Sequence, residues 1–182
     1  MDVSLSMRAL VALDTWLRVE GAAGIRIVLV GASAGILTGQ LPRGRTTVDC
    51  DVMTVLPPDA EGALLRAADE VSVRLGLPPT WLNTDVQLLR HALPDGWEAR
   101  CATIHVGDAL EVRAIGRIDL LCMKIYAGRP QDLEDLRSMS PTGDELGFAR
   151  SYVEALRSRG EPDTHVTDAR AVIAFLGGAD GA

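Results

Sequence analysis

Two aspartates separated by one residue form the pattern with the clearest chemical meaning. Asp49 and Asp51 flank Cys50 in the stretch 48–56, whose alternation predicts a β-strand with both carboxylates on one face. Like charges placed so close repel each other unless a cation lies between them. Mg²⁺ binds through one or two carboxylates and completes its shell with water and phosphate oxygens. The pair predicts a Mg²⁺ (or Mn²⁺) site for nucleotide phosphates. The alternative is two surface aspartates on an edge strand.

A turn of small residues precedes this pair. The apolar, β-branched run 25–30 predicts a strand that Gly31 ends. The small side chains of 31–33 would allow a triphosphate to approach the backbone closely. We expect Ser33 to hydrogen-bond a phosphate with help from neighbouring backbone N–H groups. The alternative role for Ser33 is that of a helix cap.

Two further charged residues are candidates for the same chemistry. Arg45 lies in a basic loop that leads into the acidic strand, so it is expected to hold phosphate or the acceptor, unless the loop is simply solvated. Glu111, in a second expected strand over 109–115, would supply a third carboxylate if that strand neighbours the acidic one. A solvated outer face explains Glu111 equally well.

Only one of the eighteen basic residues, Lys124, is a lysine, and it lies in a strongly apolar stretch, 117–126, that predicts a buried helix. A buried lysine needs an anionic partner, a phosphate or a depressed pKa; the alternative is that its chain reaches to the surface. Asp132 and Asp135 follow on one face of the next expected helix, soon after Arg129. We expect them to hold Lys124 or Arg129, or to contact the nucleotide. As an alternative, Asp132 simply suits a first helical turn.

Hydrophobic spacing and end signals predict the remaining elements. Helices are expected over 6–19, 32–39, 59–75, 117–126, from about 131, 142–158 and 167–176, and strands over 25–30, 48–56, 99–106 and 109–115. No structure is predicted for 81–86. The length of 182 residues fits one domain, with a core over about 22–140 and a C-terminal helical segment over about 141–177.

Composition narrows the function classes. The net charge of −7 is the wrong sign for a protein that binds nucleic acid mainly by coating its phosphates, although a local basic cleft stays open. Three cysteines without paired spacing predict neither a disulfide framework nor a zinc site, and three scattered histidines predict no metal site and no hydrolase triad. No signal peptide and no membrane span are expected. We therefore expect a cytoplasmic protein.

The order of these motifs resembles the AbiEii/MenT-type nucleotidyltransferase group of the DNA polymerase β-like superfamily. The resemblance rests on the segments 31–34, 45–51, 119–124 and 129–135 and covers roughly 26–139; the segment 81–83 also resembles one in small uncharacterised members. It implies an α/β (α+β) fold, a mixed sheet packed with helices. It further implies Mg²⁺-dependent transfer of a nucleoside monophosphate from an NTP to an acceptor. In characterised toxin members the acceptor is RNA, notably the tRNA 3′ end, and a cognate antitoxin silences the enzyme.

The resemblance also assigns roles to residues. Ser33 would contact phosphate, Asp49 and Asp51 would bind the metal, and Lys124 with Asp132 would complete the site, Asp135 being the alternative to Asp132. The nucleotide-binding set expected from the motifs is Gly31, Ser33, Arg45, Lys124 and Arg129. Two other functions remain open: a non-catalytic nucleotide- or partner-binding member of the same fold, and a metal-dependent phosphohydrolase that uses the same carboxylates.

Overall fold

The computed structural model describes residues 1–178, and the chain divides into two compact units. The N-terminal unit comprises Met1–Arg90 and Glu98–Gly116, and the C-terminal unit comprises His91–Trp97 and Arg117–Ala182. The chain therefore enters the C-terminal unit, returns to the first, and leaves it again after Gly116. The number of independently folding domains stays a prediction.

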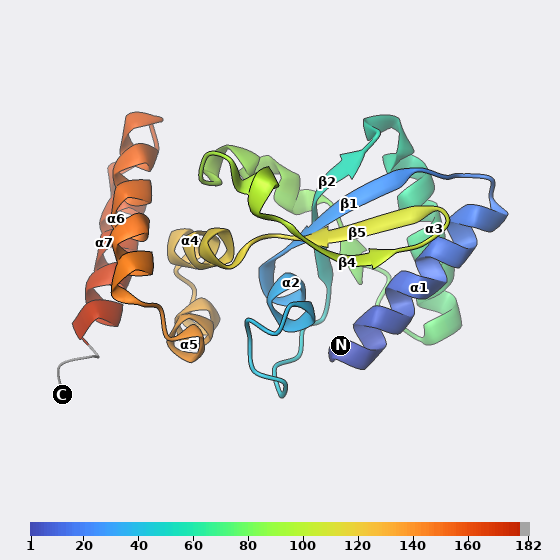
Figure 1. The fold of residues 1–182 in the computed structure, drawn as a ribbon, viewed down its shortest axis with the longest axis horizontal. Helices are drawn as coiled ribbons and strands as arrows, with labels where there is room; N and C mark the ends of the chain where they lie inside the picture. Colours follow the sequence, from blue (N-terminus) through green and yellow to red (C-terminus); the bar gives the residue numbers. More distant parts are fainter. Residues whose placement is uncertain (179–182) are drawn as a thin grey trace. The chain divides into compact units, whose positions relative to one another are not determined.

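The N-terminal unit is built on a five-stranded sheet (Figure 1). Its strands are β1 (Ile25–Val30), β2 (Cys50–Leu56), β3 (Leu82–Asn83), β4 (Ala102–Val106) and β5 (Leu110–Ala114). They lie in the order β3-β2-β1-β5-β4. β1 pairs antiparallel with β2 and parallel with β5, so the sheet is mixed. This confirms the α+β class, and β4 and β5 pair antiparallel as a hairpin.

Three helices accompany the sheet: α1 (Val3–Val19), α2 (Gly31–Leu37) and α3 (Glu61–Leu75). α1 and α3 pack against each other, and α2 lies against β1, β2 and β5. α1 buries Leu10, Leu13 and Leu17, the residues whose helical spacing predicted it. α3 ends at Gly76, which adopts the left-handed conformation that glycine accepts at little cost.

Short 3₁₀ segments connect these elements. They are η1 (Pro58–Ala60), η2 (Asp85–Ala92) and η3 (Trp97–Arg100). The β4–β5 hairpin is held by Asp14 of α1, whose Oδ1 atom accepts from the backbone N–H groups of Ala109 (2.9 Å) and Leu110 (2.8 Å). A Cβ at Gly107 would come within 2.3 Å of the same carboxylate, so only glycine fits at that point of the turn.

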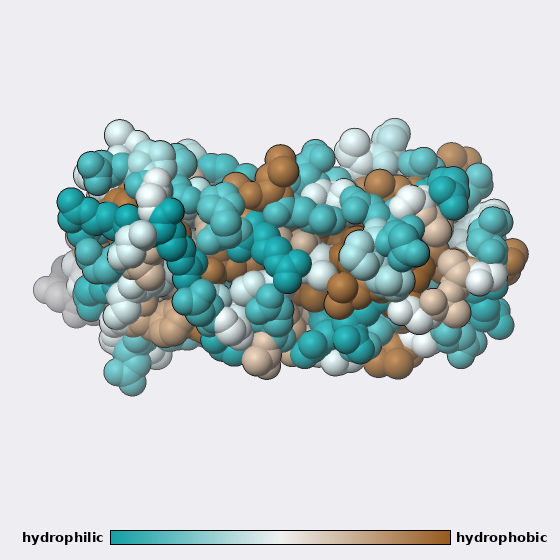
Figure 2. All heavy atoms as spheres, turned by 90° about the horizontal axis from the view of Figure 1, so that it is seen from above, coloured by the Kyte–Doolittle hydropathy of each residue, from teal (hydrophilic) through white to brown (hydrophobic). Residues whose placement is uncertain are grey.

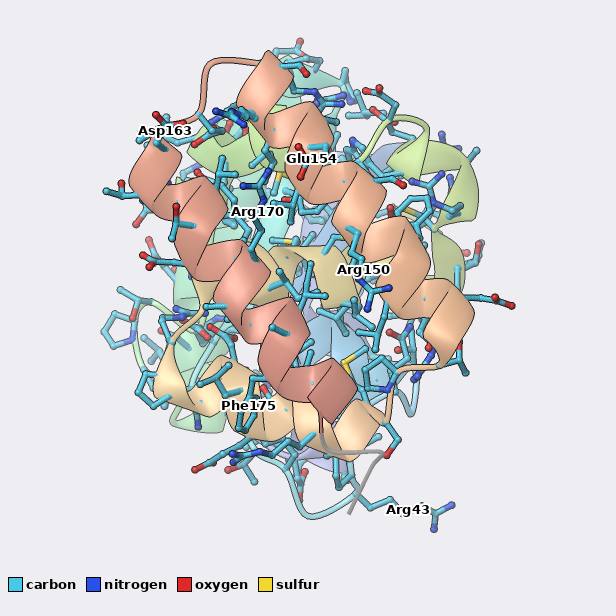
Figure 3. The ribbon with its side chains drawn as sticks, turned by 90° about the vertical axis from the view of Figure 1, so that its left-hand side faces the viewer. Arg43, Arg150, Glu154, Asp163, Arg170 and Phe175 are labelled. Carbon is cyan, nitrogen blue, oxygen red and sulfur yellow. The ribbon has the colours of Figure 1, made fainter. Side chains whose placement is uncertain are left out.

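The C-terminal unit contains α4 (Arg117–Ala127), α5 (Pro130–Met139), α6 (Gly143–Ser158) and α7 (Asp163–Gly178). α4 packs against the other three, and α6 and α7 lie side by side (Figure 3). A capping box opens α6, with Thr142 and Glu145 each bonding the other's backbone. Arg170 of α7 bonds Glu154 of α6 at 2.6 Å and so ties the two helices together.

Several predicted element starts were wrong by two to four residues; α1 begins at Val3 rather than 6, and β4 begins at Ala102 rather than 99. β2 begins at Cys50 rather than Val48, because its first ladder bond runs from the N–H of Cys50 to the carbonyl of Trp81 (2.6 Å). Val48 precedes this pairing and is 72% exposed. α7 begins at Asp163, four residues before the expected Thr167, directly after Pro162. Proline suits a helix start because it needs no N–H partner there.

Hydrophobic residues reach the surface in small separate patches among hydrophilic ones (Figure 2). The most exposed are Val73, Leu88, Val48, Val106 and Val19. Scattered exposed residues of this kind are normal. Within residues 1–178, none of the helices has the length and apolar character needed to traverse a bilayer.

Candidate functional site

The carboxylate of Asp51 lies at the centre of the candidate site in the N-terminal unit. Asp51 is the second residue of β2, paired with Val30 on one side and Asn83 on the other. Its Oδ1 atom accepts a hydrogen bond from Asn83 Nδ2 at 3.2 Å. A Cβ at Gly31 would lie 2.8 Å from its Oδ2 atom. Asp51 is therefore enclosed by the ends of β1 and β3 yet remains half-buried rather than sealed.

Asp49 lies immediately before β2, so the prediction that it belongs to the strand was wrong by one residue. Its Oδ1 atom accepts from the hydroxyl of Thr47 at 3.2 Å, and the side chain is half-buried. Cys50, between the two aspartates, is fully buried. Burial, followed by the charges of Asp49 and Asp51, raises the pKa of the Cys50 thiol to about 12, while a hydrogen bond with Ser33 opposes the rise. Both carboxylates are thus close enough to affect the Cys50 thiol, which stays protonated.

Gly31 is the first residue of α2 and has φ +65°, a conformation that favours glycine. It ends β1 as predicted. Ser33 is only 1% exposed, and its hydroxyl donates to the carbonyl of Val30 at 3.1 Å. The hydroxyl proton is therefore used inside the unit, and Ser33 is not the residue that caps α2, a position that Val30 occupies without a side-chain bond.

Arg45 and Glu111 lie in the same unit. Arg45 is half-buried in the loop before β2, and its guanidinium donates to the carbonyl of Thr46. Glu111 was expected to supply a third carboxylate only if its strand neighbours the acidic strand. It does not, because β1 separates β5 from β2. Glu111 lies opposite Arg26, with which it forms a 2.7 Å ion pair, and Arg26 in turn lies opposite Leu56 at the far end of β2. Glu111 therefore belongs to the other end of the sheet from Asp51.

Asn83 is the contact that sequence reasoning missed. It comes from β3, a strand of two residues, which is too short to show any periodicity. One signal was available: Asn83 is the only asparagine in the chain. It comes two residues after the fully buried Trp81 and is the β3 partner of Asp51.

The remaining predicted residues form a second cluster in the C-terminal unit. Lys124 of α4 is 4% exposed, and its Nζ atom lies 3.1 Å from Asp132 Oδ1 and 2.6 Å from Asp135 Oδ2. Arg129 Nε bonds Asp132 Oδ2 at 2.7 Å. Lys124 does not reach to the surface, so that alternative was wrong. Both aspartates hold Lys124, and Asp132 also holds Arg129, which is one of the expected arrangements; a contact of these aspartates with the nucleotide stays a prediction.

The donors around Asp49 and Asp51 suit a hard cation. Within residues 1–178, no three or more His, Cys, Asp or Glu side chains are arranged to hold a metal ion, so the protein would supply at most this pair. The protonated Cys50 offers no thiolate, and soft metals select thiolate ligands. Oxygen donors with few protein ligands match Mg²⁺, which keeps several waters and takes substrate phosphates. The residues present therefore fit Mg²⁺ or Mn²⁺.

The family model described as "Nucleotidyltransferase of unknown function (DUF6036)" matches residues 8–143, most of the chain. The chain belongs to this nucleotidyltransferase family. The DUF6036 match includes every element of the sheet and both clusters described above, and it ends at the start of α6. No curated protein and no solved structure matches the chain. The closer resemblance to the AbiEii/MenT-type group stays a prediction.

Proposed function

We propose that this DUF6036 member is a Mg²⁺-dependent enzyme that transfers a nucleoside monophosphate from an NTP to an acceptor hydroxyl. The observation that carries the proposal is the pair of aspartates that flanks Cys50, the first residue of β2, with the carboxylate of Asp51 against Gly31. The chain's membership of a nucleotidyltransferase family supports it. Mg²⁺, when bound there, would bridge phosphate oxygens and neutralise the charge that develops at the α-phosphate.

The chain's own residues would position the cation and the nucleotide phosphates. Asp49 and Asp51 would hold the cation from one short segment, so their separation is fixed by the backbone. Gly31, without a Cβ, leaves the Asp51 carboxylate in place and keeps the adjacent backbone open to a phosphate. The resemblance also assigns Lys124 and Asp132 of the C-terminal unit to the reaction, so we expect turnover to depend on both.

For the acceptor we propose RNA, with the tRNA 3′ end as the first candidate, and for the partner a cognate antitoxin. Both rest on the resemblance to the AbiEii/MenT-type group. The net charge of −7 requires that RNA be bound by a local basic surface rather than by the whole protein. Arg45, in the loop directly before the aspartates, is the residue we assign to such contacts.

One experiment tests the reaction and the acceptor together. The protein is incubated with Mg²⁺, each α-labelled NTP in turn and total cellular RNA, beside Asp49→Ala as the matched control. Label on a discrete RNA band that vanishes with Asp49→Ala supports the proposal. Undiminished transfer by Asp49→Ala overturns it. Release of pyrophosphate without any acceptor would instead indicate the phosphohydrolase.

A non-catalytic binding module is the second candidate, and specific contacts favour it. The hydroxyl of Ser33 and the ammonium of Lys124, two groups expected to meet phosphate, are already bonded within the protein. Metal-dependent NTP binding without a transfer product would support this candidate.

A further inference from the structure

The amide of Asn83 contacts the carboxylate that the proposed function makes central. Asn83 Nδ2 lies 3.2 Å from Asp51 Oδ1. An ionised carboxylate only accepts hydrogen bonds, so the amide group that faces it must be the NH₂ donor. The contact joins neighbouring strands at directly opposed positions, since Asp51 and Asn83 are partners in the β2–β3 register.

The fold holds Asn83 rigidly, although β3 has only two residues. Trp81, just before it, is fully buried, and its indole Nε1 donates to the carbonyl of Ala68 in α3 at 2.9 Å. The carbonyl of Trp81 accepts from Cys50 at 2.6 Å, which fixes β3 beside the start of β2. Leu82 is 3% exposed and adds a second buried anchor. The position of Asn83 is thus set by α3 and β2 together.

Asn83 and Gly31 lie against different oxygens of Asp51. Asn83 donates to Oδ1, whereas Oδ2 lies against Gly31, where a Cβ would come within 2.8 Å. A carboxylate with one oxygen held by a donor has a fixed rotation about its Cβ–Cγ bond. The orientation of the whole carboxylate is then set by Asn83. A neutral amide achieves this without adding a third negative charge to the aspartate pair.

We propose that Asn83 is a positioning residue that fixes the Asp51 carboxylate for cation binding. This rests on the proposed function, because it takes Asp51 to be a ligand of Mg²⁺. Side chains that orient metal ligands by hydrogen bonds commonly contribute tenfold or more to metal affinity. Asn83 does not itself have to touch the cation or the nucleotide.

The single asparagine of the chain permits a direct test. Selective ¹⁵N-asparagine labelling yields one side-chain NH₂ signal pair, which belongs to Asn83. Titration with Mg²⁺ is expected to shift this pair saturably, and Asp51→Asn is expected to abolish the shift. The readout needs neither an NTP nor an acceptor.

The affinity test uses Mn²⁺, with free Mn²⁺ counted by its paramagnetic resonance signal. Asn83→Ala is expected to raise the Mn²⁺ dissociation constant about tenfold. Thr84→Val is the matched control, since the neighbouring Thr84 is half-buried and its hydroxyl makes no hydrogen bond to the part of the chain that the structure describes. It should leave the constant unchanged.

Asn83→Asp covers the case in which Asn83→Ala does not fold. It keeps the shape of the side chain but sets an anion against Asp51 Oδ1. We expect a lower Tm without cation and a larger Mn²⁺-induced rise in Tm than for the parent protein, because the cation relieves the repulsion. An unchanged Tm without cation would count against the proposal.

The outcomes separate this inference from the function beneath it. If the parent protein binds Mn²⁺, Asp51→Asn abolishes binding and Asn83→Ala leaves the dissociation constant unchanged, Asn83 is not a positioning residue and the proposed function stands. If the parent protein binds no Mn²⁺ with or without NTP, the proposed function fails and this inference fails with it.

Discussion

The Nζ atom of Lys124 lies 2.6 Å from the Oδ2 atom of Asp135, and both side chains are 4% exposed. Two buried partners at this distance depend on each other: without Lys124 the buried Asp135 loses its cation, and without Asp135 the buried Lys124 keeps only Asp132. Asp132 shares Lys124 at 3.1 Å and receives Arg129 as well, so the four residues form one balanced network between α4 and α5.

Asp135→Ala is expected to lower the free energy of unfolding by about 1.5–3 kcal/mol, because Lys124 loses one charged hydrogen bond but keeps Asp132. Urea denaturation followed by circular dichroism would measure it. Glu134→Ala, at the exposed neighbouring position of α5, serves as the control and should change stability by no more than about 0.5 kcal/mol. Equal losses for the two variants would show that the network contributes nothing.

Lys124 should also be protected from chemical modification. Acylation of the native protein with an amine-reactive ester is expected to modify the N-terminal amine and to leave Lys124 intact, because its ammonium is buried and bonded twice. Peptide mass spectrometry would locate the label. In urea both amines should react, and rapid labelling of Lys124 in the native protein would contradict the buried position.

The helices were predictable because their signals are local. The spacing of leucines in α1, the glycine after α3 and the capping box of α6 each lie within one turn or two of the element they define. The chemistry of Asp49 and Asp51 was equally visible, because only Cys50 separates the two residues in the sequence.

Contacts made by strand order and by burial could not be predicted in the same way. The role of Glu111 depended on which strand lies beside β2, and nothing in the segment 109–115 encodes that β1 separates them. β3 is too short for a pattern, so Asn83 was missed. The sequence could name partners for Lys124 but could not decide between a buried pair and a surface position.

Gly31→Ala is expected to disturb Asp51 specifically. The new Cβ would lie 2.8 Å from Asp51 Oδ2 in a backbone conformation of φ +65°, so the carboxylate must move and the backbone is strained by about 1–2 kcal/mol. We expect loss of Mn²⁺ binding with a modest fall in Tm. Gly147→Ala in α6 is the matched control: nothing lies within 4 Å of its Cβ, and alanine favours a helix. Unchanged Mn²⁺ affinity for Gly31→Ala would remove Asp51 from the proposed site.

Cys50 should resist thiol reagents up to high pH. Burial and the neighbouring aspartates raise the pKa of its thiol to about 12, against 9.0 for an ordinary thiol, and only the thiolate reacts. We expect no reaction with a disulfide reagent at pH 8 and rapid reaction in urea, measured at Cys50 by peptide mass spectrometry.

The raised pKa of the Cys50 thiol also makes the stability of the protein depend on pH. The unfolded chain releases this proton first, so stability should fall as the pH rises above 9.0.

Glu161, in the turn between α6 and α7, gathers side chains that the sequence shows as scattered. Its carboxylate accepts from His91 Nε2 at 2.9 Å and from the hydroxyl of Tyr126 at 3.1 Å, and His165 Nδ1 lies 3.4 Å away. Burial alone would raise the pKa of Glu161, but the bonds from Tyr126, His165 and His91 outweigh it, so this pKa lies below its ordinary value. Two of the three histidines thus meet one half-buried carboxylate in the C-terminal unit.

Glu161→Gln is therefore expected to destabilise the protein in a pH-dependent manner. Because the folded-state pKa of Glu161 lies below its ordinary value of 4.5, the ionised group contributes fully above pH 4.5, and its contribution is lost as the pH falls through the folded-state pKa. The variant should lose about 1–3 kcal/mol at pH 7, the usual cost of removing a buried charged acceptor, and the difference from the parent should shrink toward pH 3. Thermal unfolding at several pH values would measure it, with Glu154→Gln, an exposed ion-pair member, as control. A difference that stayed constant from pH 7 to pH 3 would show that the bonds to Glu161 do not depend on its charge.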